Sequence, residues 1–213
     1  MAEDAAARLA EHRPQSVLWA CTSGSFLYGW EGAQRQAAQL SEVAGLPASS
    51  TSLAFAEACR ALGIDAVAVA ASYPGDVAAG FTTFLAGADI EVVGMRANDI
   101  LTATDAGTID GDTLFDMVVT ADHPAAQAIL IPDTALHTAT WINDLEAQVG
   151  KPVLTANQVT AWEGARLAGA TPHSDKLGAL FSQTPLVQAP RLQTQPAQVP
   201  SVPVRSDTPS RPR

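Results

Sequence analysis

The chain has 213 residues, 47% hydrophobic and 16% charged, which suits one sizeable core or two small lobes and excludes disorder throughout. The net charge of −10 lacks the basic footprint of nucleic-acid binders and disfavours anionic lipid, so neither nucleic acid nor membrane is expected as a partner. No secretory leader or bilayer-length apolar run is visible, and we expect a cytoplasmic protein.

Helices and strands alternate along the predicted chain. In order they are a helix over 5–11, a strand over 16–21, helices over 31–44 and 50–62, a strand over 66–70, a helix over 76–86, a strand over 90–95, a helix over 112–121, a strand over 128–131, a helix over 138–149, a strand over 152–154 and a helix over 158–168. Gly45 and Gly63 are placed to end the second and third helices. Strands separated by single helices indicate an α/β fold with parallel sheets, whose strand ends gather at one edge.

One order of elements occurs twice: a strand, a polar turn, a helix, a Gly-x-Pro segment, a helix and a glycine, over 17–63 and again over 129–169. This repetition predicts two Rossmann-like lobes related by a pseudo-twofold axis. We assign 1–63 plus about 155–184 to the first lobe and 64–154 to the second. The extra residues 26–31 of the first copy are expected to form a substrate loop.

The end of the chain has a different composition. Residues 185–213 contain seven prolines, four arginines and no aromatic residue. Such a segment cannot build a core, and it is predicted to be a disordered tail.

Cys21 is the first candidate for catalysis. It ends a buried strand and begins the turn Cys-Thr-Ser-Gly-Ser, where backbone amides can hold a carboxylate and activate a thiol. A structural cysteine packed in the core is the alternative. Cys59 lies in the middle of a helix and is assigned no role. Two cysteines are too few for a disulfide framework, and we expect reduced thiols.

Asp133 takes the place of Cys21 in the second copy. It is a candidate for giving or taking a proton across a cleft, although Asp-Thr before a helix is also an ordinary N-cap. Tyr73, after the strand over 66–70, can present its hydroxyl to the same edge, or lie on the rim with its hydroxyl in water. The sequence contains none of the dinucleotide, P-loop, α/β-hydrolase or zincin motifs, and no histidine pair at ligand spacing. We therefore expect a reaction without cofactor or metal.

These residues stand in a familiar order. The segments 18–26, 47–52, Tyr73-Pro74, Asp133-Thr134 and 150–158 resemble the maleate cis-trans isomerase and arylmalonate decarboxylase group of the Asp/Glu racemase superfamily, over about residues 8–181. The resemblance implies two Rossmann-like lobes, a cofactor-free site between them, a small dicarboxylate substrate and a possible homo-oligomer. By that resemblance Cys21 is the nucleophile, and the substrate is bound by Thr22, Ser23, Tyr73, Asn98 and Thr134.

The sequence departs from this group at two points. Asp133 stands where the second lobe of the group carries a cysteine, which argues against a symmetric two-thiol racemase. The chain also begins in the helix before the Cys21 strand, so we expect the first lobe to lack its N-terminal strand.

Three functions remain open. The leading one is a cofactor-independent isomerase of a small dicarboxylic acid with Cys21 as nucleophile. The second is an arylmalonate-type decarboxylase, and the third is a truncated relative that binds a carboxylate without turnover.

Overall fold

The computed structural model describes residues 8, 9 and 11–182. Residues 8 and 9 are helical, and the rest of the helix expected over 5–11 is outside the described residues except for residue 11. The tail predicted over 185–213 also lies outside them. Within the described residues, no helix is long and apolar enough to span a membrane.

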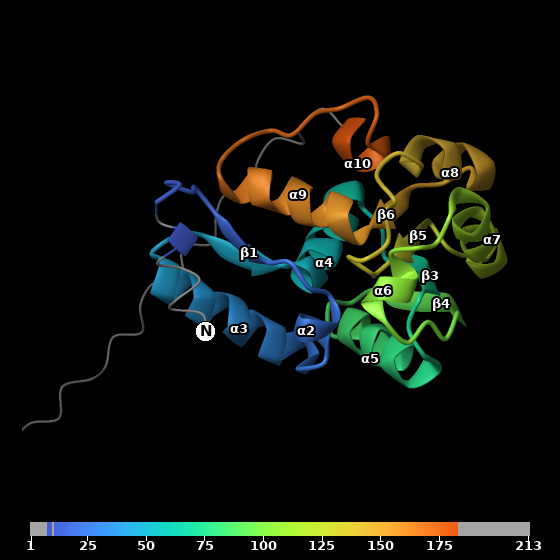
Figure 1. Cartoon of the computed structure of the whole chain (residues 1–213), viewed down its shortest axis with the longest axis horizontal. Helices are drawn as coiled ribbons and strands as arrows, with labels where there is room; N and C mark the ends of the chain where they lie inside the picture. The colour runs from blue at the N-terminus through green and yellow to red at the C-terminus, as the bar shows by residue number, and fades with distance from the viewer. Residues whose placement is uncertain (1–7, 10, 183–213) are drawn as a thin grey trace, which may run out of the picture.

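Two parallel sheets form the framework, and they lie in different halves of the molecule (Figure 1). The smaller sheet pairs β1 with β2, and the larger has the strand order β4-β3-β5-β6. The strands are β1 (Val17–Trp19), β2 (Ala48–Ser50), β3 (Ala66–Ala71), β4 (Glu91–Ala97), β5 (Ala128–Ile131) and β6 (Val153–Thr155). The α/β class and the parallel sheets predicted from the sequence are therefore confirmed.

Helices cover both sheets. They are α2 (Ser23–Phe26), α3 (Gly29–Ala44), α4 (Thr51–Leu62), α5 (Gly75–Ala86), α6 (Ala103–Ala106), α7 (Gly111–Ala121), α8 (Ile142–Val149), α9 (Ala156–Leu167) and α10 (Gly178–Ser182). The helices α3 and α4 end at Gly45 and Gly63, whose φ angles of 65° and 68° belong to the left-handed region. Both predicted stops are confirmed, because glycine adopts this conformation without steric cost.

The central strand β3 is buried on both faces. Val67 and Val69 belong to one core cluster, and Ala68 and Ala70 belong to the other, as the two-residue repeat of a strand requires. The first cluster includes the side chains of α4, α5 and α9, and the second includes those of α7 and α8. Burial on both faces explains why this strand is an unbroken apolar run in the sequence.

The helix α9 joins the two halves. It follows the last strand of the larger sheet and packs against α4, β2 and β1 (Figure 1). The hydroxyls of Thr51 and Thr160 lie 2.7 Å apart across the α4–α9 contact. Beside them, Arg166 donates two hydrogen bonds to the buried Glu163 and also lies 3.7 Å from the Glu57 carboxylate of α4.

Several elements differ from the sequence expectation. The residues around Phe26, expected as a loop, are helical because the Phe26 ring is fully buried against Tyr73 and Phe81. Residues 48–50 form the unpredicted strand β2, in which the polar side chain of Ser50 is satisfied by the Ser25 hydroxyl 2.8 Å away. The helix expected over 138–149 begins only at Ile142, and α6 and α10 were not predicted.

The contact between Arg166 and Glu163 leads to a prediction about stability. Burial raises the pKa of Glu163 in the folded state, and the interaction with Arg166 opposes that rise. Replacing Arg166 by alanine leaves a buried carboxylate without its partner, and we expect a loss of about 1–3 kcal/mol in the free energy of unfolding at pH 7. A raised folded-state pKa means that protonation favours the fold, so the loss should shrink as the pH falls.

Urea denaturation of the wild type and Arg166→Ala at pH 7 and pH 4.5 measures this effect. The matched control is Arg35→Ala, which removes an exposed contact with Glu31 on α3. An equal loss for Arg166→Ala at the two pH values would contradict the prediction.

Candidate active site

The predicted site residues follow the carboxyl ends of three strands. Cys21 and Thr22 come after β1, Tyr73 comes after β3, and Asp133 comes after β5. The pKa of Tyr73 is raised by burial and by the charges of Asp133 and Cys21, while an interaction with the Thr22 side chain opposes this rise. The Phe26 ring of α2, just after the Cys21 turn, lies 6.0 Å from the Tyr73 ring, and the Tyr73 hydroxyl donates to the carbonyl of Pro132, next to Asp133. The turn after β1 and the ends of β3 and β5 therefore adjoin, and we call Cys21, Thr22, Tyr73 and Asp133 the cluster.

Cys21 is half-buried at the mouth of its turn. The Gly24 N–H donates to the Cys21 Sγ at 3.4 Å, and the Ser23 Oγ lies 3.9 Å from the same sulfur. A Cβ at Gly24 would lie 2.8 Å from the Trp19 Nε1 and 3.1 Å from the Cys21 Sγ. Only glycine therefore lets the turn close over the thiol, and a backbone N–H directed at sulfur stabilises a thiolate.

Two further side chains hold this turn in place. The buried Ser52 hydroxyl donates to the Thr22 carbonyl at 2.8 Å, and the Gln36 side-chain amide donates to the Gly24 carbonyl at 2.9 Å. Neither residue is predicted from the sequence. Ser52 belongs to the polar segment at the start of α4, but Gln36 is in the middle of α3 and no local pattern distinguishes it.

Thr22 and Tyr73 face each other within the cluster. The Tyr73 hydroxyl donates to the carbonyl of Pro132, so its proton is engaged in the protein itself. The Thr22 hydroxyl oxygen is buried and has no hydrogen-bond partner among the described residues. The Thr22 side chain nevertheless acts on the pKa of the Tyr73 hydroxyl, so the two hydroxyl groups lie close to each other inside the cluster.

Asp133 is fixed through both oxygens. Its Oδ1 accepts a hydrogen bond from the Ala135 N–H at 2.8 Å, and its Oδ2 accepts one from the Ser72 hydroxyl. The first contact is the local turn expected of an aspartate after a strand, and the second comes from the neighbouring strand β3. Within the described part of the chain, no Lys, Arg or His forms an ion pair with Asp133.

The other predicted substrate contacts lie at the same edge of the sheets. The Asn98 side-chain amide donates to the Ala71 carbonyl at 2.8 Å, so it supports the end of β3. The Thr134 carbonyl accepts a hydrogen bond from Asn157 at 3.0 Å. Substrate binding by Asn98, Thr134 and Ser23 stays a prediction.

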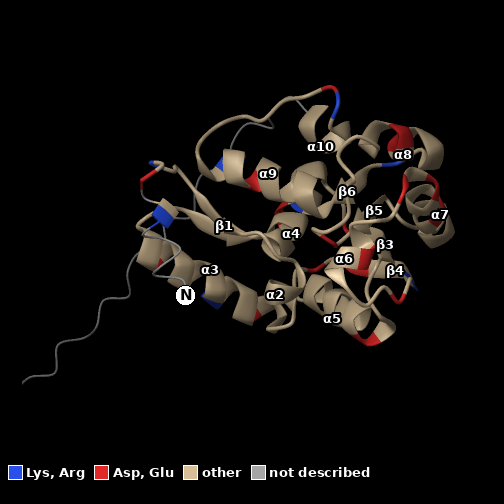
Figure 2. Ribbon diagram, in the orientation of Figure 1, with Lys and Arg blue, Asp and Glu red and all other residues tan. Residues whose placement is uncertain are grey.

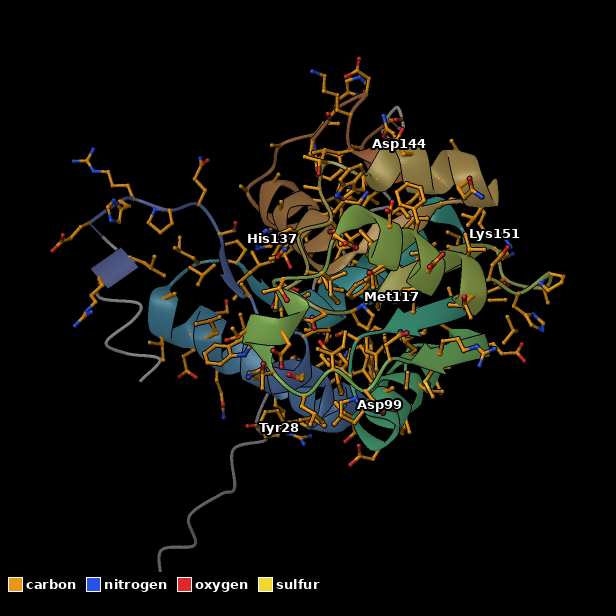
Figure 3. The ribbon with its side chains drawn as sticks, turned by 45° about the vertical axis from the view of Figure 1, so that its right-hand side comes forward. Tyr28, Asp99, Met117, His137, Asp144 and Lys151 are labelled. Carbon is orange, nitrogen blue, oxygen red and sulfur yellow. The ribbon has the colours of Figure 1, made fainter. Side chains whose placement is uncertain are left out.

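Charged and ligating groups are distributed unevenly. Asp and Glu gather around α6, α7 and α8, with few Lys or Arg among them (Figure 2). Across residues 8, 9 and 11–182, no group of three His, Cys, Asp or Glu side chains is placed to hold a metal ion. His137 is exposed on the segment between β5 and α8 (Figure 3).

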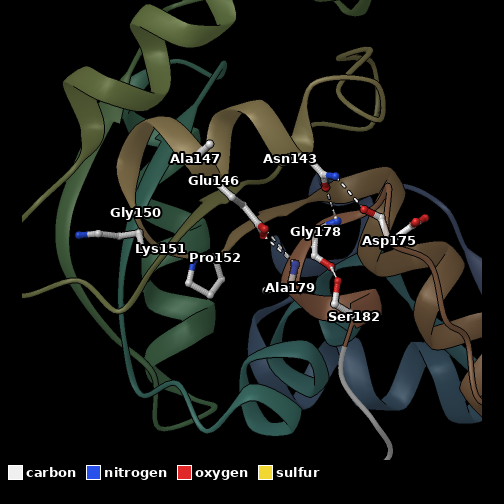
Figure 4. A pocket seen from close by; sticks show the side chains of 10 residues that line it. All are labelled: Asn143, Glu146, Ala147, Gly150, Lys151, Pro152, Asp175, Gly178, Ala179 and Ser182. Carbon is white, nitrogen blue, oxygen red and sulfur yellow. Dashed lines mark hydrogen bonds between the residues drawn. The ribbon is translucent and has the colours of Figure 1, made fainter.

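A surface pocket of about 500 Å³ lies away from this cluster, between α8, α10 and the start of β6 (Figure 4). Its Glu146 carboxylate accepts backbone hydrogen bonds from Val153 and Ala179, which attach α10 to the sheet. Pro152 precedes β6 whereas Asp133 follows β5, so the two places are at opposite ends of parallel strands.

Comparisons with known proteins fit this arrangement. Residues 1–181 match the arylmalonate decarboxylase family. The arylmalonate decarboxylase of Bordetella bronchiseptica is 32% identical over 168 residues, which cover 78% of this chain and 70% of the relative. The chain belongs to the arylmalonate decarboxylase family. Its relatives are enzymes of the Asp/Glu racemase superfamily, as the sequence resemblance implied.

Solved structures of this family and of maleate isomerases share the fold. A liganded double mutant of arylmalonate decarboxylase matches with a TM-score of 0.81 and 31% identity, covering 85% of this chain and 79% of that one. The maleate isomerase of Pseudomonas putida S16, in a variant with maleate, matches with a TM-score of 0.80 and 22% identity, covering 85% and 75%. At that identity the second match concerns the fold alone.

The two cysteines of this family member should differ sharply towards an alkylating reagent. Cys59 is completely buried and its pKa is raised to about 12 by burial, whereas Cys21 is half-exposed. Since only an accessible thiolate reacts, iodoacetamide at pH 8 should add one label per native chain, at Cys21. Peptide mass spectrometry locates the label.

The controls are Cys21→Ser, which should stay unlabelled while folded, and the wild type in denaturant, which should take two labels. Rapid labelling of Cys59 in the native wild type would contradict the described burial.

Proposed function

We propose that this chain catalyses a cofactor-independent reaction at the carbon next to a carboxylate of a small acid, with Cys21 as its catalytic thiol and Asp133 as an ionised carboxylate beside it. The observation that carries the proposal is the cluster of Cys21, Thr22, Tyr73 and Asp133 at the strand ends, where Phe26 packs against Tyr73 and the Tyr73 hydroxyl donates to the carbonyl next to Asp133. Within this cluster Cys21 is the single thiol, since Cys59 is buried in the core away from it.

The substrate carboxylate has a natural place beside the thiol. The turn after β1 offers the backbone N–H groups of Thr22 and Ser23, which lie directly after Cys21. Donors fixed in this way stabilise the negative charge that develops on a carboxylate when its α-carbon becomes a carbanion or enediolate. Tyr73 would join them by exchanging its bond to the Pro132 carbonyl.

Decarboxylation is the reaction that we favour, because the relative that is 32% identical over 168 aligned residues is an arylmalonate decarboxylase. The C–C bond of a malonate breaks, carbon dioxide leaves, and the electron pair remains as an enediolate. The Cys21 thiol then gives its proton to the α-carbon, and the thiolate regains a proton from water. Ionised Asp133 would repel the departing carboxylate, and this repulsion disappears with the neutral carbon dioxide.

One relative supports a site whose thiol lies at the position of Cys21, after β1. Among the matching structures is an arylmalonate decarboxylase in which one glycine is replaced by cysteine and one cysteine by serine. The two exchanged positions lie nearly as far apart in that sequence as Cys21 and Asp133 do here. Moving the thiol from the later of these positions to the earlier one would give the arrangement of this chain, which has a cysteine at position 21 and none at position 133.

Isomerisation of a small dicarboxylic acid is the second candidate, because Cys21 matches the nucleophile of the isomerases. In that reaction Asp133 takes the thiol proton, the Sγ adds to one alkene carbon, and the alkene electron pair moves to the other carbon and its carboxylate as an enediolate. The resulting single bond rotates, the enediolate pair expels the thiolate and restores the alkene, and Asp133 returns the proton to the sulfur. A maleate isomerase of Nocardia farcinica, which shares this fold, is known with a covalently bound succinylcysteine intermediate.

Proton NMR in D2O distinguishes these reactions. With a mixture of phenylmalonate, maleate and aspartate, we expect phenylacetate carrying one deuterium at its α-carbon. Cys21→Ala should lower its rate of formation about 10²–10⁴-fold, the usual contribution of a positioned proton donor. Cys59→Ala is the matched control and should retain activity if it folds.

The other outcomes are equally informative. Fumarate formed from maleate and lost in Cys21→Ala would select the isomerase, and full activity of Cys21→Ala would overturn the assignment of the thiol. A silent wild type that phenylmalonate nevertheless stabilises against heat would select the carboxylate-binding relative without turnover.

A further inference from the structure

Two neighbouring residues at the end of β3 bind two neighbouring residues at the end of β5. Ser72 donates to the Asp133 carboxylate, and Tyr73 donates to the Pro132 carbonyl. The pairing of β3 with β5 places Val69 opposite Leu130, so continuing the register places Ser72 opposite Asp133. The contact with Asp133 therefore follows from the strand alignment.

Ser72 is completely buried, so its hydroxyl has no access to water as an alternative partner. A buried hydroxyl that donates to a carboxylate makes a charge-assisted hydrogen bond, which is stronger than one between neutral groups. The carboxylate accepts through both oxygens, from Ser72 and from the Ala135 N–H. These two donors fix both oxygens, and with them the orientation of the carboxylate plane.

The titratable groups around Asp133 come from three segments. Tyr73 faces it from the end of β3, and Cys21 shares the cluster from the turn after β1. On its own segment the nearest is His137, which is exposed. None of the Lys, Arg or His residues that the structure describes pairs with Asp133, so the hydrogen bonds from Ser72 and Ala135 are what fixes the orientation of its carboxylate.

We propose that Ser72 is a positioning residue that holds the Asp133 carboxylate in a fixed orientation at the Cys21 cluster. The catalytic part of this inference rests on the proposed function, in which both candidate reactions use the ionised form of Asp133. The structural part, that the Ser72 hydroxyl holds the carboxylate, stands independently of any substrate.

A double-mutant cycle in stability tests the structural part. The proteins are the full-length wild type, Ser72→Ala, Asp133→Ala and the double variant, and urea denaturation at pH 7 gives each midpoint. We expect Ser72→Ala to lower the midpoint in the wild type and to have much less effect in Asp133→Ala.

The same four proteins test the catalytic part through kcat and KM for the substrate that the wild type turns over. Ser72→Ala should lower kcat about tenfold at pH 7 with little change in KM, since one charged hydrogen bond is lost. Ser72→Thr, which keeps the hydroxyl, should restore kcat. Ser41→Ala removes a serine hydrogen bond to the Leu46 carbonyl at the C-terminal end of α3 and serves as the matched control.

The outcomes separate this inference from the proposed function. Equal effects of Ser72→Ala with and without Asp133, in stability or in kcat, would overturn the positioning role. A wild type without turnover would count against the proposed function, and the stability cycle would still decide whether Ser72 holds the carboxylate.

Discussion

The contact between α4 and α9 is the constraint on which the site depends. Each sheet is short, and the side chains that form the cluster come from both of them. Because α9 leaves the larger sheet and packs on α4 beside the smaller one, the end of β1 is fixed opposite the ends of β3 and β5. The buried Glu163 is paired with Arg166 of the same helix, and Arg166 also lies 3.7 Å from the Glu57 carboxylate of α4, which adds a charged contact between the two helices.

The sequence was most informative where the cause of a structure is local. The left-handed glycines after α3 and α4 were predicted from their positions, and the apolar run of β5 was predicted to the residue. The failures have tertiary causes. Residues around Ser50 were expected to lie outside any strand, because nothing in the segment reveals that buried hydroxyls elsewhere will satisfy them. Phe26 was placed in a loop because its partners, Tyr73 and Phe81, are distant in sequence.

The same distinction between local and tertiary causes separates the site residues that the sequence predicts from those that it does not. Cys21, Thr22, Tyr73 and Asp133 could be selected because each follows a predicted strand, and parallel strands end at a common edge. Their roles in catalysis remain proposals. Gln36 and Ser72 could not be selected, because each donates a hydrogen bond to a group that is distant in sequence. Gln36 donates to the Gly24 carbonyl, and Ser72 donates to the Asp133 carboxylate. Register and helix packing decide such contacts, and neither can be obtained from local composition.

The alignment of Ser72 with Asp133 also bears on how this enzyme could be redesigned. A library that introduced a second thiol in place of Asp133 alone would leave a buried serine hydroxyl beside a poor acceptor. The unpaired Ser72 hydroxyl would lower the stability of the variant. That loss would be attributed to the new cysteine, although its cause lies in the neighbouring strand. Positions 72 and 133 should therefore be varied together. We expect double variants to yield active two-thiol sites that single substitutions do not.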